Sequence, residues 1–187
     1  MKHKIKTVAV YCGHTFGLNP EFMHDAGLMG ELIAKNGLNM VFGGGNVGLM
    51  GTVASAAIAG GAHVTGISTE HVIALQEPVH KEIDVEIVQG VNERKQKMFE
   101  LSDAFIILPG GIGTLNEVTD ILTMQQIGET AKPIFFLNTC RFWGPLHSLI
   151  IDMLNNKFIE TLDDYKVIIS GTPEELITAV LNYKDSK

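Results

Sequence analysis

The sequence contains no long run of like charges and no long hydrophobic run. Its 187 residues include 14 Lys and Arg against 21 Asp and Glu, which gives a formal net charge of −7. A protein that binds the backbone of a nucleic acid needs a concentrated positive face, and this composition does not offer one. No segment reaches the roughly 18 consecutive apolar residues of a membrane-spanning helix. We therefore expect neither a nucleic-acid partner nor a membrane partner.

Cysteine is also scarce. The two cysteines, Cys12 and Cys140, form no C-x-x-C pair and lack the spacing of metal ligands. The basic N-terminus leads into a short strand-like run that is too brief for the core of a signal peptide. The sequence thus predicts a cytoplasmic protein with no metal site.

Short apolar runs typical of buried strands alternate with amphipathic segments typical of helices. The expected strands are residues 7–12, 39–42, 63–67, 85–88, 104–108, 133–137 and 166–169, and the expected helices are residues 20–36, 47–59, 92–102, 114–127, 143–155 and 173–181. Near-continuous apolar strands fit a parallel sheet that is covered on both faces. The pattern predicts an α/β fold with a doubly wound, mostly parallel sheet, helices on both faces, and a single domain over residues 1–187. Residues 68–82 give no clear pattern.

Helix-end signals support these boundaries. Asn19 and Thr172 are candidate N-caps, and each precedes a proline suited to the first helical turn. Gly37 and Gly128 suit the ends of helices.

The first glycine-rich turn is GGGNVGLMG, residues 43–51, which follows an expected strand and opens a helix. Glycine lets another group approach the backbone closely, and the amides at a helix N-terminus favour an anion. A tight turn with close packing of helix on sheet explains the same residues. The turn alone does not decide between these interpretations.

The second glycine-rich turn is PGGIGTLNE, residues 109–117. Thr114 can cap the following helix or donate to a phosphate oxygen. Glu117 lies on the same helical face as Thr114, Ile121 and Met124, so a carboxylate shares a face with apolar side chains. Glu117 is either a structural capping carboxylate or an acid of a functional site, because a buried carboxylate is costly unless it is paired.

A basic pair lies in VNERKQKM, residues 91–98. Arg94 and Lys95 fall on the apolar stripe of this helix with Val91 and Met98. Taken alone, such side chains usually extend along the apolar surface to water. The helix precedes the strand that leads to Glu117, however, so a βαβ connection can bring an inward arginine beside that carboxylate.

Together, FGGGNVGLMG, NERKQKM and PGGIGTLNE resemble the LOG family, the cytokinin riboside 5′-monophosphate phosphoribohydrolases, over nearly the whole chain. The resemblance implies a Rossmann-like nucleotide-binding domain and a homodimer. It also implies an N-glycosidase, a hydrolase of cytokinin biosynthesis that splits a nucleoside 5′-monophosphate into base and ribose 5-phosphate. AMP or an N6-substituted AMP is the implied substrate.

The resemblance assigns roles to particular residues. It makes Arg94 and Glu117 the catalytic pair: the carboxylate binds the ribose, stabilises positive charge on it or activates water, and the arginine holds the substrate or orients Glu117. The implied substrate-binding residues are Gly44, Gly45, Lys95, Met98, Pro109, Gly110, Gly111, Gly113 and Thr114. The family is also described as lysine decarboxylase-like, but no lysine here stands in a setting that singles it out as the Schiff-base lysine of pyridoxal phosphate. We expect no cofactor.

The sequence departs from the family pattern around the expected base pocket. The family commonly has an aromatic residue at Ile112, Glu at Asn116 and Trp at Met124, and often Ser at His14. These differences bear on which base is bound, and the role of His14 is open. A nucleotide or molybdenum-cofactor carrier of the same superfamily is the alternative function, and an interaction protein with purely structural glycine turns is a third.

Overall fold

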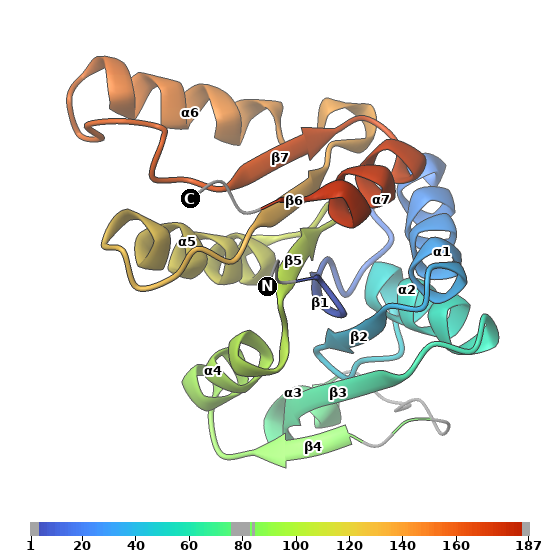
Figure 1. The fold of residues 1–187 in the computed structure, drawn as a ribbon. Coiled ribbons are helices and arrows are strands. Elements are labelled where there is room, and N and C mark those ends of the chain that lie inside the picture. The colour runs from blue at the N-terminus through green and yellow to red at the C-terminus, as the bar shows by residue number, and fades with distance from the viewer. Residues whose placement is uncertain (1–3, 76–82, 84, 185–187) are drawn as a thin grey trace.

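The computed structural model describes residues 4–75, 83 and 85–184, which form one seven-stranded sheet with helices packed against it (Figure 1). The strands are β1 (Thr7–Tyr11), β2 (Asn39–Phe42), β3 (Val64–Thr69), β4 (Val85–Val88), β5 (Ala104–Ile107), β6 (Ile134–Leu137) and β7 (Val167–Ser170). The helices are α1 (Pro20–Lys35), α2 (Gly48–Ala59), α3 (Glu70–Leu75), α4 (Val91–Leu101), α5 (Ile112–Gln126), the short 3-10 helix η1 (Thr139–Arg141), α6 (Gly144–Asn155) and α7 (Pro173–Asn182). The expected α/β class is confirmed.

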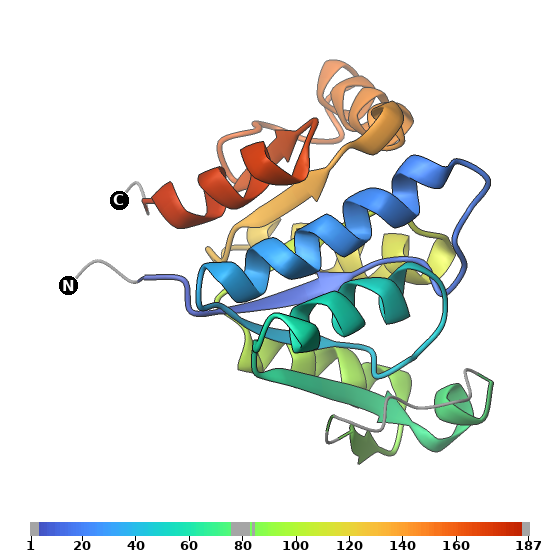
Figure 2. The same ribbon diagram turned by 90° about the vertical axis from the view of Figure 1, so that its right-hand side faces the viewer.

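The sheet order is β4-β3-β2-β1-β5-β6-β7, and every described pairing is parallel. Helices α1, α2 and α7 cover one face, as the turned view shows, whereas α4 and α5 lie on the other (Figure 2). The chain builds outward from β1 to β4 and then crosses back to β5 on the other side of β1. In such sheets, ligands bind at the carboxyl ends of the strands where the order reverses, which here is between β1 and β5.

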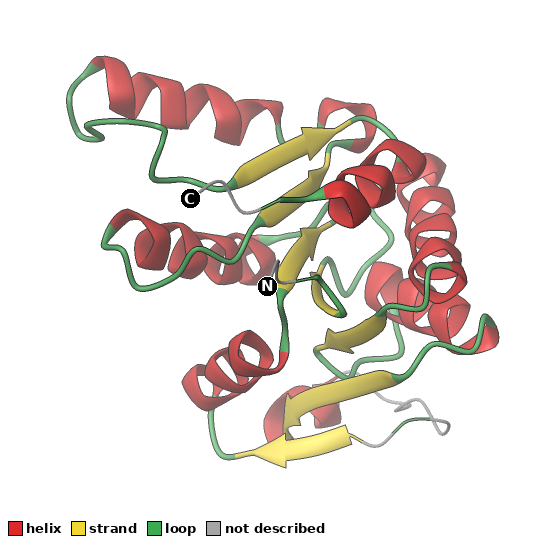
Figure 3. Cartoon of the chain, in the orientation of Figure 1, coloured by secondary structure: helices red, strands yellow, loops and turns green. Residues whose placement is uncertain are grey.

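Local signals explain where several helices begin and end (Figure 3). The Asn19 side chain accepts a hydrogen bond from the Glu21 amide, and the Thr172 side chain accepts one from the Glu175 amide. Gly37 has a φ of +67° just after α1, a backbone conformation that glycine adopts without strain. These predictions are confirmed.

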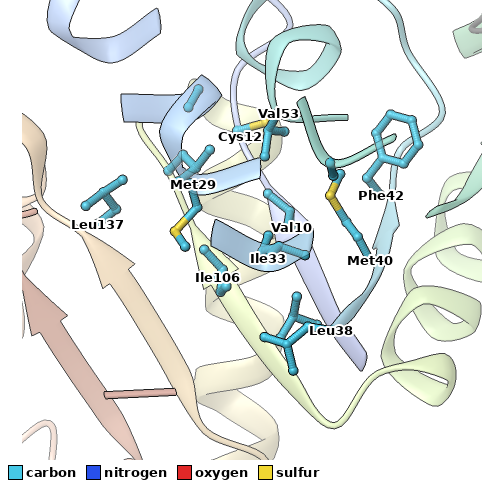
Figure 4. Close-up of a cluster of buried hydrophobic side chains, with 14 of the residues drawn as sticks. Val10, Cys12, Met29, Ile33, Leu38, Met40, Phe42, Val53, Ile106 and Leu137 are labelled. Carbon is cyan, nitrogen blue, oxygen red and sulfur yellow. The ribbon is translucent and has the colours of Figure 1, made fainter. Parts of the chain in front are cut away.

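The core on the face of α1 and α2 is formed by side chains that alternate along the strands (Figure 4). Val10, Met40 and Phe42 of β1 and β2 belong to the same buried cluster as Met29 and Ile33 of α1. Full burial of such a side chain contributes about 1.5–3 kcal/mol each. On the opposite face, the Tyr11 ring of β1 and the Phe99 ring of α4 both stack on Phe105 of β5, so aromatic rings pack between α4 and the sheet.

Some predicted boundaries differ from the structure. β3 extends to Thr69 and is followed at once by α3, within the segment that gave no sequence pattern; residues 76–82 of that segment lie outside the described residues. Thr114 does not cap α5: the N-cap is Gly111, and no side chain provides a capping bond there. Among the described residues, no helix combines the length and the apolar character that crossing a bilayer requires.

Candidate active site

Arg94 and Glu117 lie against each other in the gap between α4 and α5. Arg94 Nη1 lies 3.4 Å from Glu117 Oε1, and Arg94 Nε donates to the Ile67 carbonyl at 2.9 Å. Their side chains are only 10% and 11% exposed. The bond to β3 fixes the arginine, since a buried guanidinium requires partners for its donors. The expectation that these two side chains converge is confirmed.

The environment of Glu117 shifts its proton affinity. Burial raises the pKa of this carboxyl to about 7, Arg94 and Lys95 oppose the shift, and Asp120 adds to it. Desolvation disfavours the charged form of a carboxyl, and the two cations only partly offset this. Glu117 therefore exchanges its proton close to neutral pH, as a general acid or base requires.

Lys95 and Met98, both expected in the pocket, have different surroundings. The Lys95 ammonium is bound to Asn116 Oδ1 at 2.9 Å and to Asp120 Oδ2 at 2.6 Å, so it does not fit the free amine of a Schiff-base lysine. Met98 is fully buried in the core cluster beneath α4. Their contact with a substrate stays a prediction.

The second glycine turn leaves the start of α5 open. Gly111 and Gly113 are exposed, and a side chain added at either would meet nothing within 4 Å. The first helical amide bonded within this turn is that of Leu115, which donates to the Gly111 carbonyl. Within the described part of the chain, the amides of Ile112, Gly113 and Thr114 thus remain available, as the first amides of a helix do. Free amides at a helix start favour an anion, and these lie one turn before Glu117.

The rest of this turn is packed tightly. A Cβ at Gly110 would fall on the Thr114 hydroxyl, so glycine is required there. The Pro109 carbonyl accepts a hydrogen bond from the Gly13 amide at 3.0 Å, which ties the turn to the end of β1. Pro109 thus supports the turn through its backbone.

The first glycine turn serves packing at the start of α2. The amides of Leu49 and Met50 donate to the carbonyls of Thr15 and Gly13, at 3.4 and 3.1 Å. Gly48 has a φ of +62°, and a Cβ there would fall on the His14 carbonyl. The loop after β1 thus occupies the Leu49 and Met50 amides, so these two are not free for an anion.

Gly44 and Gly45 are buried at the carboxyl end of β2. Their contact with a nucleotide stays a prediction. His14 is exposed on the neighbouring loop.

A cavity of about 170 Å³ adjoins Glu117 between α4 and α5. It is lined by Tyr11, Asn92, Lys95, Gln96, Phe99, Glu117, Asp120, Ile121 and Met124. Burial raises the Tyr11 pKa well above its usual range, so the phenol stays protonated. Sequence reasoning missed Tyr11 and Asp120. Asp120 lies three residues after Glu117, a spacing that places both on one side of the helix and was the available signal.

Comparison with solved structures identifies the same fold. A molybdenum cofactor binding protein from Rippkaea orientalis aligns with a TM-score of 0.66 and 28% identity, covering 96% of this chain and 99% of that one. The molybdenum cofactor carrier protein of Chlamydomonas reinhardtii aligns with a TM-score of 0.68 at 20% identity over 95% of this chain and 96% of that one. The second likeness shows the fold alone.

Sequence comparisons are more specific. Residues 50–180 match the model of a family described as "Possible lysine decarboxylase". The chain is 36% identical to the cytokinin riboside 5′-monophosphate phosphoribohydrolase LOG of Oryza sativa subsp. japonica, covering 97% of this chain and 75% of that protein. It is 38% identical to the cytokinin riboside 5′-monophosphate phosphoribohydrolase of Rhodococcoides fascians, covering 94% and 89%. The chain therefore belongs to the LOG-like family, whose model carries the description "Possible lysine decarboxylase".

Proposed function

We propose that the protein hydrolyses the N-glycosidic bond of a nucleoside 5′-monophosphate, AMP or an N6-substituted AMP such as a cytokinin riboside monophosphate. The observation that carries this proposal is the buried Arg94–Glu117 pair, which lies one turn beyond the available amides of α5. The names of the relatives in rice and Rhodococcoides fascians support the same reaction class.

The geometry suits the order of groups in such a substrate. The amides of Ile112, Gly113 and Thr114 bind the 5′-phosphate, which places the ribose near Glu117 further along α5. Water attacks C1′ while the C1′–N bond breaks, and the base leaves with the bonding electrons and takes up a proton from the solvent. The ionised Glu117 stabilises the positive charge that develops on the sugar and accepts the proton of the attacking water.

Base release from defined nucleotides tests the proposal. Pure folded protein is incubated with AMP and with isopentenyl-AMP, and free base and ribose 5-phosphate are measured. We expect both products in equal amounts, and we expect Glu117→Gln to lose turnover while it remains folded. If no purine or pyrimidine monophosphate yields free base, the proposal is wrong.

The alternative is a carrier of a nucleotide or of the molybdenum cofactor, and the 28% identical Rippkaea orientalis protein is the observation in its favour. A carrier would use the α5 amides but has no need of a carboxylate that titrates near neutral pH beside an arginine. Retention of a ligand through purification without turnover would favour the carrier.

The protein is further proposed to act as a homodimer through α6. This helix has no buried residue although half of it is apolar. Together with α5, β6 and β7 it borders an apolar groove of about 480 Å³. A second copy covers such an apolar surface.

The two free cysteines, Cys12 and Cys140, support a reducing compartment, the cytoplasm.

A further inference from the structure

Lys95 and Asp120 form a second ion pair between α4 and α5, next to the Arg94–Glu117 pair. Lys95 Nζ lies 2.6 Å from Asp120 Oδ2 and also donates to Asn116 Oδ1 at 2.9 Å. Lys95 directly follows Arg94 in the sequence, and Asn116 directly precedes Glu117. The two pairs therefore cross the same gap next to each other.

These side chains are the direct polar links between the two helices. In the described ranges, the hydrogen bonds and ion pairs that join α4 to α5 all come from Arg94 or Lys95. The cavity of about 170 Å³ lies between the same helices, so packed side chains do not fill the gap. Lys95 therefore adds a second polar link across the gap that Arg94 and Glu117 span.

Lys95 and Asp120 also interact electrostatically with Glu117. The charged groups around this carboxylate are Arg94 and Lys95 on α4 and Asp120 on α5, and the neutral Tyr11 and Cys12 lie beneath it on and after β1. Asp120 opposes ionisation of Glu117, and Lys95 favours it. Because Lys95 is also paired with Asp120, it favours ionisation of Glu117 in two ways: directly, and by offsetting the negative charge of Asp120.

We propose that Lys95 and Asp120 are positioning residues, which tie α4 to α5 and balance the charge beside Glu117 so that the carboxylate faces Arg94 in its ionised form. This inference rests on the proposed function for the role of Glu117 in turnover. It assigns Lys95 a task within the protein, in place of the substrate contact expected from the sequence.

Two single variants and their combination test the proposal through the pH profile of base release. In Lys95→Met, Asp120 is left uncompensated, so the midpoint of the ascending limb moves to higher pH. In Asp120→Asn, Lys95 is left uncompensated, so the midpoint moves to lower pH. We expect each shift to be roughly 0.5 pH unit. The double variant returns near the wild-type midpoint but loses roughly tenfold in kcat/KM, because the tie between the helices is gone.

The matched control is Lys97→Met. Lys97 is on the same helix and is also bridged, but its partner is Glu86 of β4, at 2.8 Å. This variant removes the same charge without touching the α4–α5 link, so we expect an unmoved midpoint. If both single variants slow turnover and leave the midpoint in place, Lys95 and Asp120 are merely structural and the proposal is overturned.

A readout that needs no turnover separates this proposal from the proposed function. Carbon-13 NMR of glutamate-labelled protein follows the titration of Glu117, with Glu117→Gln identifying the signal. If the Glu117 pKa shifts in opposite directions in Lys95→Met and Asp120→Asn but the protein releases no base, the positioning role is supported and the hydrolase proposal is contradicted. If the protein is active but the Glu117 pKa is the same in all variants, the hydrolase proposal is supported and the positioning role is contradicted. If Lys95→Met fails to fold, Asp120→Asn alone decides the test. Asp120 is half-exposed and asparagine has nearly the same shape, so this variant should fold, and the proposal expects its Glu117 pKa to fall.

Discussion

Gly43 lies directly against the guanidinium of Arg94: a Cβ at position 43 would fall on Arg94 Nη2. The arginine crosses the end of β2 at this point, between its hydrogen bond to Ile67 and its contact with Glu117. The glycine is therefore a condition for the Arg94–Glu117 pair, and its absent side chain is the space that the guanidinium occupies.

We accordingly expect Gly43→Ala to displace Arg94 and to lower kcat/KM for AMP about 100-fold, since small displacements of a catalytic group have effects of this size. The fold should persist, because the alanine methyl displaces the end of a long side chain. Gly27→Ala in α1 is the control: its nearest neighbour would be a Thr52 methyl at 3.7 Å, an ordinary contact. Equal activity in the two variants would show that Arg94 need not hold this position.

Ile112→Pro tests the phosphate site through a single amide. Ile112 is the first residue of α5, where proline is well tolerated, and its side chain is 81% exposed. The substitution therefore removes one N–H and little else. We expect ribose 5-phosphate to bind about five- to tenfold more weakly, measured by calorimetry, in line with one lost hydrogen bond to an anion. Ile112→Ala retains the amide and should bind like the wild type; equal affinity in all three proteins would place the phosphate elsewhere.

The order of strands and helices could be predicted from the sequence because each buried strand is a short apolar run and each helix carries its own end signals. Residues 104–108 and 133–137 show the first kind of evidence, and Asn19 and Thr172 show the second. The pairing of Arg94 with Glu117 followed from their helical faces and from the βαβ connection between them. These properties are local or depend on simple topology.

The use of each glycine could not be predicted in the same way. Two similar turns each precede a helix. The loop after β1 bonds the Leu49 and Met50 amides at the start of α2, whereas the first amides of α5 remain available. That difference arises from contacts between segments far apart in the chain, such as Gly13 with Met50. The roles of Gly43 and Asp120 were missed for the same reason, because both depend on how α4 lies over the sheet and beside α5.

The α6 surface predicts the outcome of a charge substitution. Leu149 on α6 is 50% exposed and lines the apolar groove, so Leu149→Glu would place a carboxylate in the proposed dimer interface at a cost of several kcal/mol. We expect sedimentation to change from a dimer to a 20.3 kDa monomer. Leu181→Glu is the control, because Leu181 is similarly exposed at the end of α7 and does not line the groove. A wild-type chain that already sediments as a monomer would contradict the interface.

Glu117→Gln should change how stability depends on pH. The folded-state pKa of Glu117 is about 7, raised from 4.5, so the folded protein binds this proton more tightly than the unfolded chain does. Below pH 4.5 the carboxyl is protonated in both states and resembles glutamine. As pH rises from 4.5 to 7, the wild type loses stability because the unfolded chain releases this proton while the buried carboxyl retains it, and the glutamine variant does not share this loss. The free energy of unfolding of the variant should therefore exceed that of the wild type at pH 8 by on the order of 3 kcal/mol more than at pH 4.5. Urea denaturation at both pH values measures this difference, and parallel stabilities would mean that Glu117 ionises as readily in the folded protein as in water.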